Sequence, residues 1–114
     1  MDIHQDHQGR VLVVAPVGRL DSTTSEALEQ ALTTALDQRE CQLVVDFEGV
    51  TYISSVGLRV LLTVAKRIRE GHGSLVLCAL GDAVRQVFEL AGFLPLFSIE
   101  RARDLAITRC APGA

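Results

Sequence analysis

The sequence has few aromatic residues and no tryptophan. Its 114 residues include one tyrosine and four phenylalanines, so aromatic side chains make up 4% of the chain. A hydrophobic core must therefore be built from Leu, Val, Ile and Ala, and the hydrophobic fraction of 48% is large enough to supply one. Charged residues amount to 22%, which is typical of a globular chain rather than a disordered one. The length suits a single domain.

Long hydrophobic runs and long basic runs are both absent. The apolar stretches are far shorter than the roughly 20 residues that a membrane-spanning helix needs. The first ten residues are polar, which is unlike a signal peptide. We therefore expect a cytoplasmic protein without direct membrane insertion. The formal net charge is −3 and no run of Lys or Arg is long enough to follow a phosphate backbone, so nucleic acid is not an expected partner.

The sequence also lacks the ligand patterns of a metal site. His4 and His7 have no third ligand nearby, and His72 stands between two glycines. The cysteines are odd in number and show no C-x-x-C spacing, which suits free thiols in a reducing cytosol better than disulfides or zinc. We expect no metal and no cofactor. The three cysteines are Cys41, Cys78 and Cys110.

What is present is an alternation of apolar strands and amphipathic helices. Residues 1–110 are predicted to form one domain and 111–114 a frayed C-terminal tail. The alternation predicts an α/β fold, with a mixed, mostly parallel β-sheet of about four to five strands packed with about four helices. In chain order we predict a strand at 11–15, a turn or bulge at 16–18, a short strand at 17–20, a helix from about 23 to 38–40, a strand at 41–47, a helix from 54–55 to about 70, a strand at 74–80, a helix from 82 that is closed by Gly92, a strand at 94–97 and a helix at 100–109.

The helix ends carry their own signals. Thr23 and Glu26 have the spacing of a capping box at the first helix. Gly71 is placed to act as the C-cap of the second helix. The residues expected to be buried are Leu58, Leu61, Leu62, Ala65 and Ile68 in the second helix, and Val84, Val87, Phe88 and Leu90 in the third.

Ser54 and Ser55 stand between a predicted strand end and the second helix. Partners and ligands of open α/β sheets bind beyond the carboxyl ends of the strands, and the serine pair falls at that edge. A serine at a helix start lies beside free backbone N–H groups and the positive end of the helix dipole. Such a place accommodates a phosphate group, although a serine here is also an ordinary N-cap. Local physics leaves both roles open.

Three segments occur in a characteristic order: Gly18-Arg19-Leu20-Asp21, then Ile53-Ser54-Ser55-Val56-Gly57-Leu58-Arg59-Val60-Leu61-Leu62, and then Ala91-Gly92-Phe93-Leu94-Pro95-Leu96-Phe97. Together they resemble the STAS domain family, and in particular the bacterial anti-sigma factor antagonists. The likeness covers nearly the whole chain. In that family, a phosphorylatable serine opens the second helix, followed by a small residue, glycine and leucine. Ser55 falls on this phosphoacceptor position, with Ser54 as a neighbouring rival.

The resemblance implies a partner-switching mechanism. The unphosphorylated protein is expected to bind an anti-sigma factor that is also a serine kinase of the histidine-kinase-like ATPase type, and thereby to release the client of that factor. Phosphorylation then ejects this protein, and a metal-dependent serine phosphatase resets it. A homodimer is also compatible with the sequence. The partner-binding residues that we expect are Asp21, Ser54, Ser55, Val56, Gly57, Arg59 and Thr63.

An enzyme is the first alternative, with Ser55 as a nucleophile. The sequence lacks the glycine-flanked elbow of a hydrolase, and its histidines are badly placed to act as a base. Asp21, Asp46 and Glu48 can also be interpreted as a catalytic cluster of carboxylates. For Asp46 and Glu48, a solvated strand end and turn is the simpler interpretation. Gly71, Gly73 and Gly81 match no nucleotide-binding fingerprint. We therefore expect no enzymatic activity.

A different use of a STAS domain is the second alternative. Family members also serve as transporter tails, as stressosome scaffolds and as accessory subunits of membrane lipid-transport ATPases. We expect neither of the first two, which need a preceding transmembrane segment or an additional N-terminal domain. An accessory subunit needs no phosphoacceptor, so Ser55 with Gly57 and Leu58 after it favours the antagonist over the accessory subunit.

Overall fold

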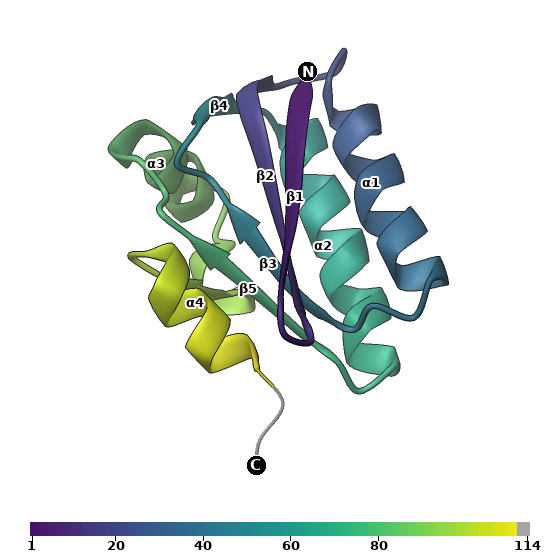
Figure 1. Ribbon diagram of the computed structural model, residues 1–114. Coiled ribbons are helices and arrows are strands. Elements are labelled where there is room, and N and C mark those ends of the chain that lie inside the picture. The colour runs from purple at the N-terminus through teal and green to yellow at the C-terminus, as the bar shows by residue number, and fades with distance from the viewer. Residues whose placement is uncertain (112–114) are drawn as a thin grey trace.

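The computed structural model describes residues 1–111, which form one α/β domain (Figure 1). Its strands are β1 (Asp2–Gln8), β2 (Val11–Leu20), β3 (Gln42–Asp46), β4 (Val50–Ile53), β5 (Ser74–Cys78) and β6 (Ser98–Glu100). Its helices are α1 (Ser25–Asp37), α2 (Ser55–Glu70), α3 (Asp82–Leu90) and α4 (Arg103–Cys110), with a short 3-10 helix η1 (Leu94–Leu96) before β6.

The strands form one mixed sheet in the order β1-β2-β3-β5-β6, and β4 pairs with the far end of β2. β1 runs antiparallel to β2, whereas the pairs β2–β3, β2–β4, β3–β5 and β5–β6 are parallel. Parallel neighbours need crossover connections, and α1 and α2 supply two of them. The predicted α/β fold with a mixed, mostly parallel sheet and four helices is confirmed, with six strands in the described residues where four to five were expected.

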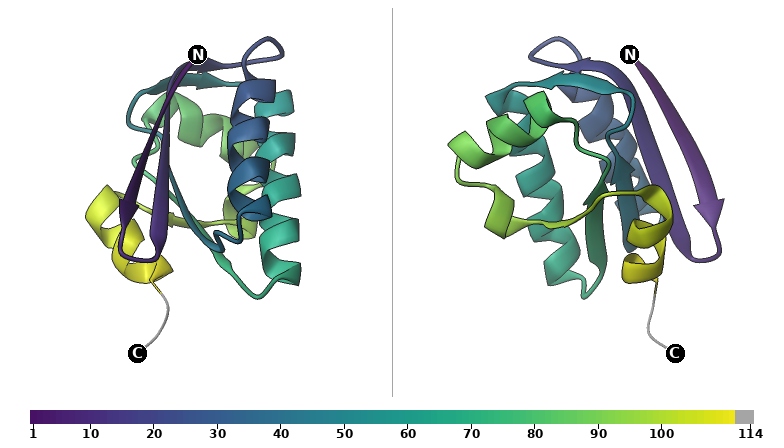
Figure 2. Two further views of the ribbon diagram at one scale, coloured as in Figure 1. Left: turned by 45° about the vertical axis from the view of Figure 1, so that its right-hand side comes forward. Right: turned by 90° about the vertical axis from the view of Figure 1, so that its left-hand side faces the viewer.

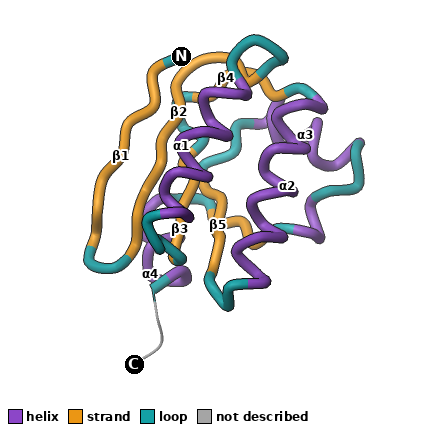
Figure 3. The backbone as a smooth tube through the Cα atoms, turned by 90° about the vertical axis from the view of Figure 1, so that its right-hand side faces the viewer, coloured by secondary structure: helices purple, strands orange, loops and turns teal. Residues whose placement is uncertain are grey.

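Helices cover the two faces of the sheet unequally. α1 and α2 lie side by side on one face (Figure 3), and α4 lies on the other (Figure 2). The larger core fills the space under α1 and α2 and includes Leu28, Leu43 and Leu61. A smaller core under α4 includes Val44 and Ala106. Because β3 is covered on both faces, its centre is a continuous apolar run.

The polar N-terminal segment, to which the sequence assigned no element, is strand β1. It pairs with β2 along its whole length. The turn or bulge expected at 16–18 does not divide two strands, because β2 continues through it as one strand of ten residues. Its pairing with β4 is irregular between Gly18 and Arg19. Gly18 has a φ of 112°, a conformation that a residue with a β-carbon rarely adopts.

The last third of the chain differs from the prediction in its short elements. The apolar run at 94–97 is not a strand, because Pro95 lies in the first turn of η1 and the pairing strand β6 follows it. The final helix α4 begins at Arg103 instead of Glu100. Residues 50–53, expected only to lead into the serine pair, form β4 beside β2.

Three details of the predicted helices are also wrong. Thr24 is the N-cap residue of α1, and Thr23 makes no capping-box bond with the helix. Leu62 of α2 is 36% exposed and Leu90 of α3 is 82% exposed, although both fit the apolar period. These two leucines lie on the outer faces of their helices.

The three cysteines are free thiols, with Cys78 and Cys110 buried and Cys41 half-buried. This agrees with the sequence. No helix in the described part of the chain is long and apolar enough to cross a membrane. Of the predicted frayed tail at 111–114, all but Ala111 lies outside the described residues.

Candidate functional site

The connection between β4 and α2 positions the serine pair. The Ser54 N–H donates to the carbonyl oxygen of Leu20 at 2.8 Å, which ties the start of α2 to the end of β2. Ser54 has an extended backbone, and its Oγ accepts a hydrogen bond from the Gly57 N–H at 3.4 Å, so Ser54 is the N-cap. Ser55 is the first helical residue and is exposed. The structure therefore separates the two serines into a half-buried cap and a solvent-accessible neighbour.

Gly57, which the sequence placed among the partner-binding residues, is buried. A β-carbon added there would lie 2.8 Å from Cγ1 of Ile53 and 3.4 Å from Cβ of Leu20. The first of these distances is too short for two carbon atoms, so a glycine is needed for α2 to begin this close to β4. Gly57 shapes the surface from beneath and offers no side chain to a partner.

Asp21 anchors the loop between β2 and α1, next to the Leu20 carbonyl that holds Ser54. Its Oδ1 accepts hydrogen bonds from the Thr23 hydroxyl at 2.7 Å and from the Thr23 N–H at 3.0 Å. These bonds lower the pKa of the Asp21 carboxyl from its ordinary value. Arg19 contributes to the same surface, because its guanidinium lies 4.3 Å from the ring centroid of Tyr52.

A groove of about 300 Å³ lies between α1 and the first half of α2. Three predicted residues, Val56, Arg59 and Thr63, line it from α2. Glu26 and Glu29 line it from α1. Neither glutamate was predicted from the sequence, since exposed acidic residues on a helix carry no motif. Among the described residues that line the groove, Arg59 is the one cation, and it shares the groove with two carboxylates.

Ser25 was missed as well. It begins α1, lines the groove and is 1% exposed. Its Oγ is buried without a hydrogen-bond partner in the described part of the chain. Only the local sequence Ser22-Thr23-Thr24-Ser25, which is rich in hydroxyl groups, hints at a polar wall here.

Large hydrophobic side chains are exposed around the serine pair. Tyr52 is 38% exposed on β4, and Val56, directly after Ser55, is 36% exposed. Val17, on the strand that β4 pairs with, is 42% exposed. Apolar side chains beside a polar groove are typical of a surface that binds another protein.

Asp46, one of the carboxylates considered as a catalytic cluster, is buried and accepts hydrogen bonds from its neighbours. Asp46 was expected to be solvated, but this is wrong, since it is 2% exposed. Its Oδ2 accepts a hydrogen bond from Arg103 Nε at 2.8 Å, and its Oδ1 accepts one from the Glu48 N–H at 2.9 Å. Within residues 1–111, no group of three or more His, Cys, Asp or Glu side chains is arranged to hold a metal ion.

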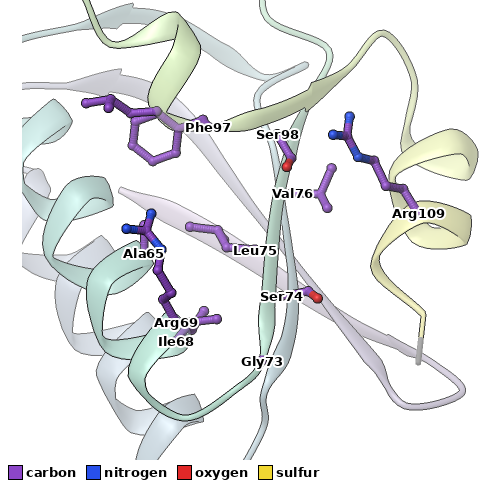
Figure 4. A pocket seen from close by; sticks show the side chains of 11 residues that line it. Ala65, Ile68, Arg69, Gly73, Ser74, Leu75, Val76, Phe97, Ser98 and Arg109 are labelled. Carbon is purple, nitrogen blue, oxygen red and sulfur yellow. The ribbon is translucent and has the colours of Figure 1, made fainter. Parts of the chain in front are cut away.

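A second hollow of about 310 Å³ lies at the C-terminal end of α2, beside β5 (Figure 4). Arg69 of α2 and Arg109 of α4 approach it from the two sides of β5, and Leu75 and Phe97 contribute apolar walls. Arg109 is already paired with Glu100 at 3.0 Å. None of the predicted site residues lines this hollow, so it is separate from the surface around Ser54 and Ser55.

Residues 2–106 match the family model described as the STAS domain. The chain belongs to the STAS domain family. One relative is BtrV of Bordetella bronchiseptica, provisionally named an anti-sigma factor antagonist, which is 41% identical over 106 residues that cover 93% of this chain and 91% of BtrV. The resemblance that the sequence motifs indicated is thereby confirmed.

Solved structures of STAS proteins share the fold. The crystal structure of an anti-sigma factor antagonist from Mycobacterium paratuberculosis has a TM-score of 0.87 and 28% identity, covering 96% of this chain and 92% of that one. The Bacillus protein SpoIIAA, in its phosphorylated form, has a TM-score of 0.74 and 21% identity, covering 96% of this chain and 100% of SpoIIAA. The second likeness concerns the fold alone.

Proposed function

We propose that this STAS protein is an anti-sigma factor antagonist whose binding is switched by phosphorylation of Ser55. The observation that carries the proposal is that the two serines have different structural roles. Ser54 holds the helix start through its backbone and its hydroxyl, whereas Ser55 is exposed at the first helical position. A kinase can therefore reach Ser55 without disturbing the cap.

The helix start accommodates the phosphate group. Ser55 lies in the first turn of α2, where backbone N–H groups without intrahelical partners and the helix dipole favour an anion. The first turn contains no acidic residue that would repel the group. Phosphorylation at this place adds a charge of about −1.5 to −2 without unfolding the domain.

The same charge opposes binding on the outside of the helix. Val56 and Tyr52 flank Ser55 with exposed apolar surface, and burying a phosphate among such groups requires a cation to compensate for its lost hydration. The neighbouring groove holds Glu26 and Glu29 against the single Arg59. A dianion beside this groove makes a surface with little positive charge still more negative, so a partner shaped for the unmodified surface dissociates.

The partners in the proposal follow from the family. The relatives that match along the chain bear names of anti-sigma factor antagonists, so we infer that the partner is an anti-sigma factor. By the family resemblance, this factor is also a serine kinase of the histidine-kinase-like ATPase type. A metal-dependent serine phosphatase restores the unmodified form. The protein itself acts in the cytoplasm as a binding module and supplies no catalytic group.

A pull-down from the native host tests the proposal, with wild type, Ser55→Ala and Ser55→Glu as baits. Wild type and Ser55→Ala are expected to retain a kinase-fold protein that Ser55→Glu loses, and mass spectrometry should find phosphate on wild-type Ser55. Ser54→Ala is the matched control, because it removes the neighbouring hydroxyl and should leave the binding switch intact. Recovery of membrane ATPase subunits by all baits, with Ser55 unmodified, would identify an accessory subunit instead.

Charge substitutions then test the binding surface. Arg59→Glu removes the cation of the groove and should abolish retention of the partner. Arg101→Glu makes the same change in charge at an exposed position just before α4, outside the groove, and should have no effect. Equal loss in both variants would show that net charge, and not the groove, governs binding.

A further inference from the structure

Strand β1 has one unpaired edge. It stands first in the strand order, so β2 covers one of its edges and no strand in the described part of the chain covers the other. Six of its seven residues are exposed, and Ile3 is half-buried. An uncovered strand edge presents a row of backbone N–H and C=O groups that can pair with another chain.

The hairpin loop determines which backbone groups are free. Gly9 and Arg10 form a two-residue loop between the paired residues Gln8 and Val11, and Gly9 has a φ of 63°, as the first loop residue of a type II′ turn requires. In such a hairpin, the closing pair exchanges both of its hydrogen bonds, and the bonding alternates from there along the strand. The residues whose N–H and C=O groups point away from β2 are therefore Ile3, Gln5 and His7.

A second β1 can pair with this edge only where outward-facing residues stand opposite one another. In the antiparallel register centred on Gln5, all seven residues are paired, and His4 of each copy stands opposite Asp6 of the other. The two neighbouring allowed registers pair five residues. One sets Asp2 opposite Asp6, and the other sets Asp6 opposite its own copy. Because like charges opposite one another destabilise a pairing, the centred register is favoured.

We propose that β1 is the contact surface for a second copy of this chain, through an antiparallel β1–β1 pairing centred on Gln5. The two-fold symmetry makes the interface self-complementary. His4 and Asp6 stand opposite Ala15 and Val13 of β2, so both project from the α4 face of the sheet. An imidazole N–H donates to a carboxylate in the neutral and in the protonated ring, so each His4–Asp6 pair contributes in either state.

The order of His4 and Asp6 along β1 favours a second copy over an unrelated strand. A polar edge strand also serves to discourage pairing, but a protective strand needs no complementary order of donors and carboxylates. The sequence of β1 places an imidazole opposite a carboxylate twice in the register that the free edge allows best. β2 lies between β1 and β4, so the Ser55 surface stays accessible in the pair. The proposal is therefore independent of the proposed function.

Exchange of His4 and Asp6 tests the register. Sedimentation velocity over a concentration series is expected to show a reversible dimer for wild type. His4→Asp and Asp6→His each set like groups opposite one another and should raise the dimer dissociation constant about tenfold. The double exchange His4→Asp/Asp6→His restores the pairs and should restore wild-type association. A wild type that stays monomeric, or single variants that associate as wild type does, would overturn the proposal.

A cross-linking pair locates the contact independently. In the centred register, the two Gln5 residues are directly opposite, at a Cα separation compatible with a disulfide, so Gln5→Cys should form covalent dimers under mild oxidation. Gln8→Cys is the control on the same exposed strand, since the two copies of residue 8 are about 20 Å apart in this register. Equal cross-linking of the two variants, or none by Gln5→Cys above the wild-type level, would contradict the pairing.

Discussion

Arg103 donates a hydrogen bond from Nε to Oδ2 of Asp46 at 2.8 Å and thereby joins the start of α4 to the end of β3, 57 positions earlier in the chain. The hydrogen bond to Asp46 raises the pKa of the Arg103 guanidinium, which remains charged throughout the accessible pH range. The Asp46 side chain is 2% exposed and the Arg103 side chain is 43% exposed. The pair is thus buried on the carboxylate side only.

Removing this arginine leaves a buried carboxylate without its cation. We expect Arg103→Ala to lower the free energy of unfolding by about 1–3 kcal/mol, less than for a fully buried pair, because water reaches the guanidinium. Urea denaturation measures the change. Arg101→Ala removes an exposed arginine two residues earlier and should cost less than about 0.5 kcal/mol. Equal costs in the two variants would show that the ion pair contributes nothing specific.

The two glycines after α2 should respond differently to alanine. A β-carbon at Gly73 would lie 2.2 Å from the carbonyl oxygen of Cys41, which is backbone and cannot turn away. At Gly71 it would meet nothing closer than 3.7 Å. We expect Gly73→Ala to destabilise the domain by about 1–3 kcal/mol and Gly71→Ala to be nearly neutral. Thermal unfolding of the two variants tests this; a larger loss for Gly71→Ala would contradict the geometry.

The thiols should differ sharply in reactivity. Burial raises the pKa of Cys78 to about 12 and that of Cys110 to about 11. Because the thiolate is the reactive form, both should resist a thiol reagent at pH 8 in the folded protein, whereas half-buried Cys41 is modified first. Mass spectrometry after brief labelling gives the order, and labelling in urea gives the total. Early modification of Cys78 would show that the sheet opens locally under α4.

The raised pKa values also make stability depend on alkaline pH. The ordinary pKa of these thiols is 9.0, so in the unfolded chain they lose their protons above that value while the folded chain keeps them. Their contribution to stability is therefore fully present below pH 9 and is lost as the pH rises toward 11 and 12. The stability difference between wild type and Cys78→Ala should shrink from pH 8 to pH 10. A constant difference would mean that Cys78 does not titrate in this way.

Because the two serines have different structural roles, their alanine variants should differ in stability. Ser54→Ala removes the N-cap bond to the Gly57 N–H and should cost about 1 kcal/mol. Ser55→Ala removes an exposed hydroxyl and should change stability by less than about 0.5 kcal/mol. Urea denaturation separates the two. The reverse order would mean that Ser55 is the cap and that the assignment of the phosphoacceptor fails.

Strong periodicity made much of the fold predictable. α2 and the buried strands β3 and β5 appear within a few residues of the predicted ranges, because their apolar spacing has only one way to be buried. The helical period alone did not distinguish buried from exposed residues at the edges of the apolar stripe. Leu62 and Leu90 fit the apolar stripe but are exposed, since the neighbouring elements do not extend over them.

β1 was not predictable from its own composition. Apart from Ile3, its residues are Asp, His and Gln, which have low strand propensity and form no alternating apolar face. It is a strand because β2 pairs with it across a two-residue loop, and the residues of β1 alone show no sign of that pairing. In the same way, the ion pair of Asp46 and the opposing glutamates of the groove depend on helices that are placed only by the fold.

Around Ser54 and Ser55, the motif predicted where the helix begins but not the structural role of each residue. Ser55 and Ser54 were both candidates for the acceptor, and only the structure shows that Ser54 is the N-cap and Ser55 the first helical residue. Gly57 appeared as part of a conspicuous motif, yet its role is to allow close packing against Ile53.

β2 is bordered on one edge by β1 from Val11 to Val17, and on the other edge by β3 and then β4. We therefore expect the amide protons in the doubly bordered part of β2 to be among the slowest in the domain to exchange with deuterium. Leu20, whose carbonyl oxygen accepts the hydrogen bond from the Ser54 N–H, is the last residue of this strand. A charged group added to the adjacent helix turn would therefore lie on a backbone that β4 and β2 hold by hydrogen bonds, and it would act on a partner through its electrostatic potential.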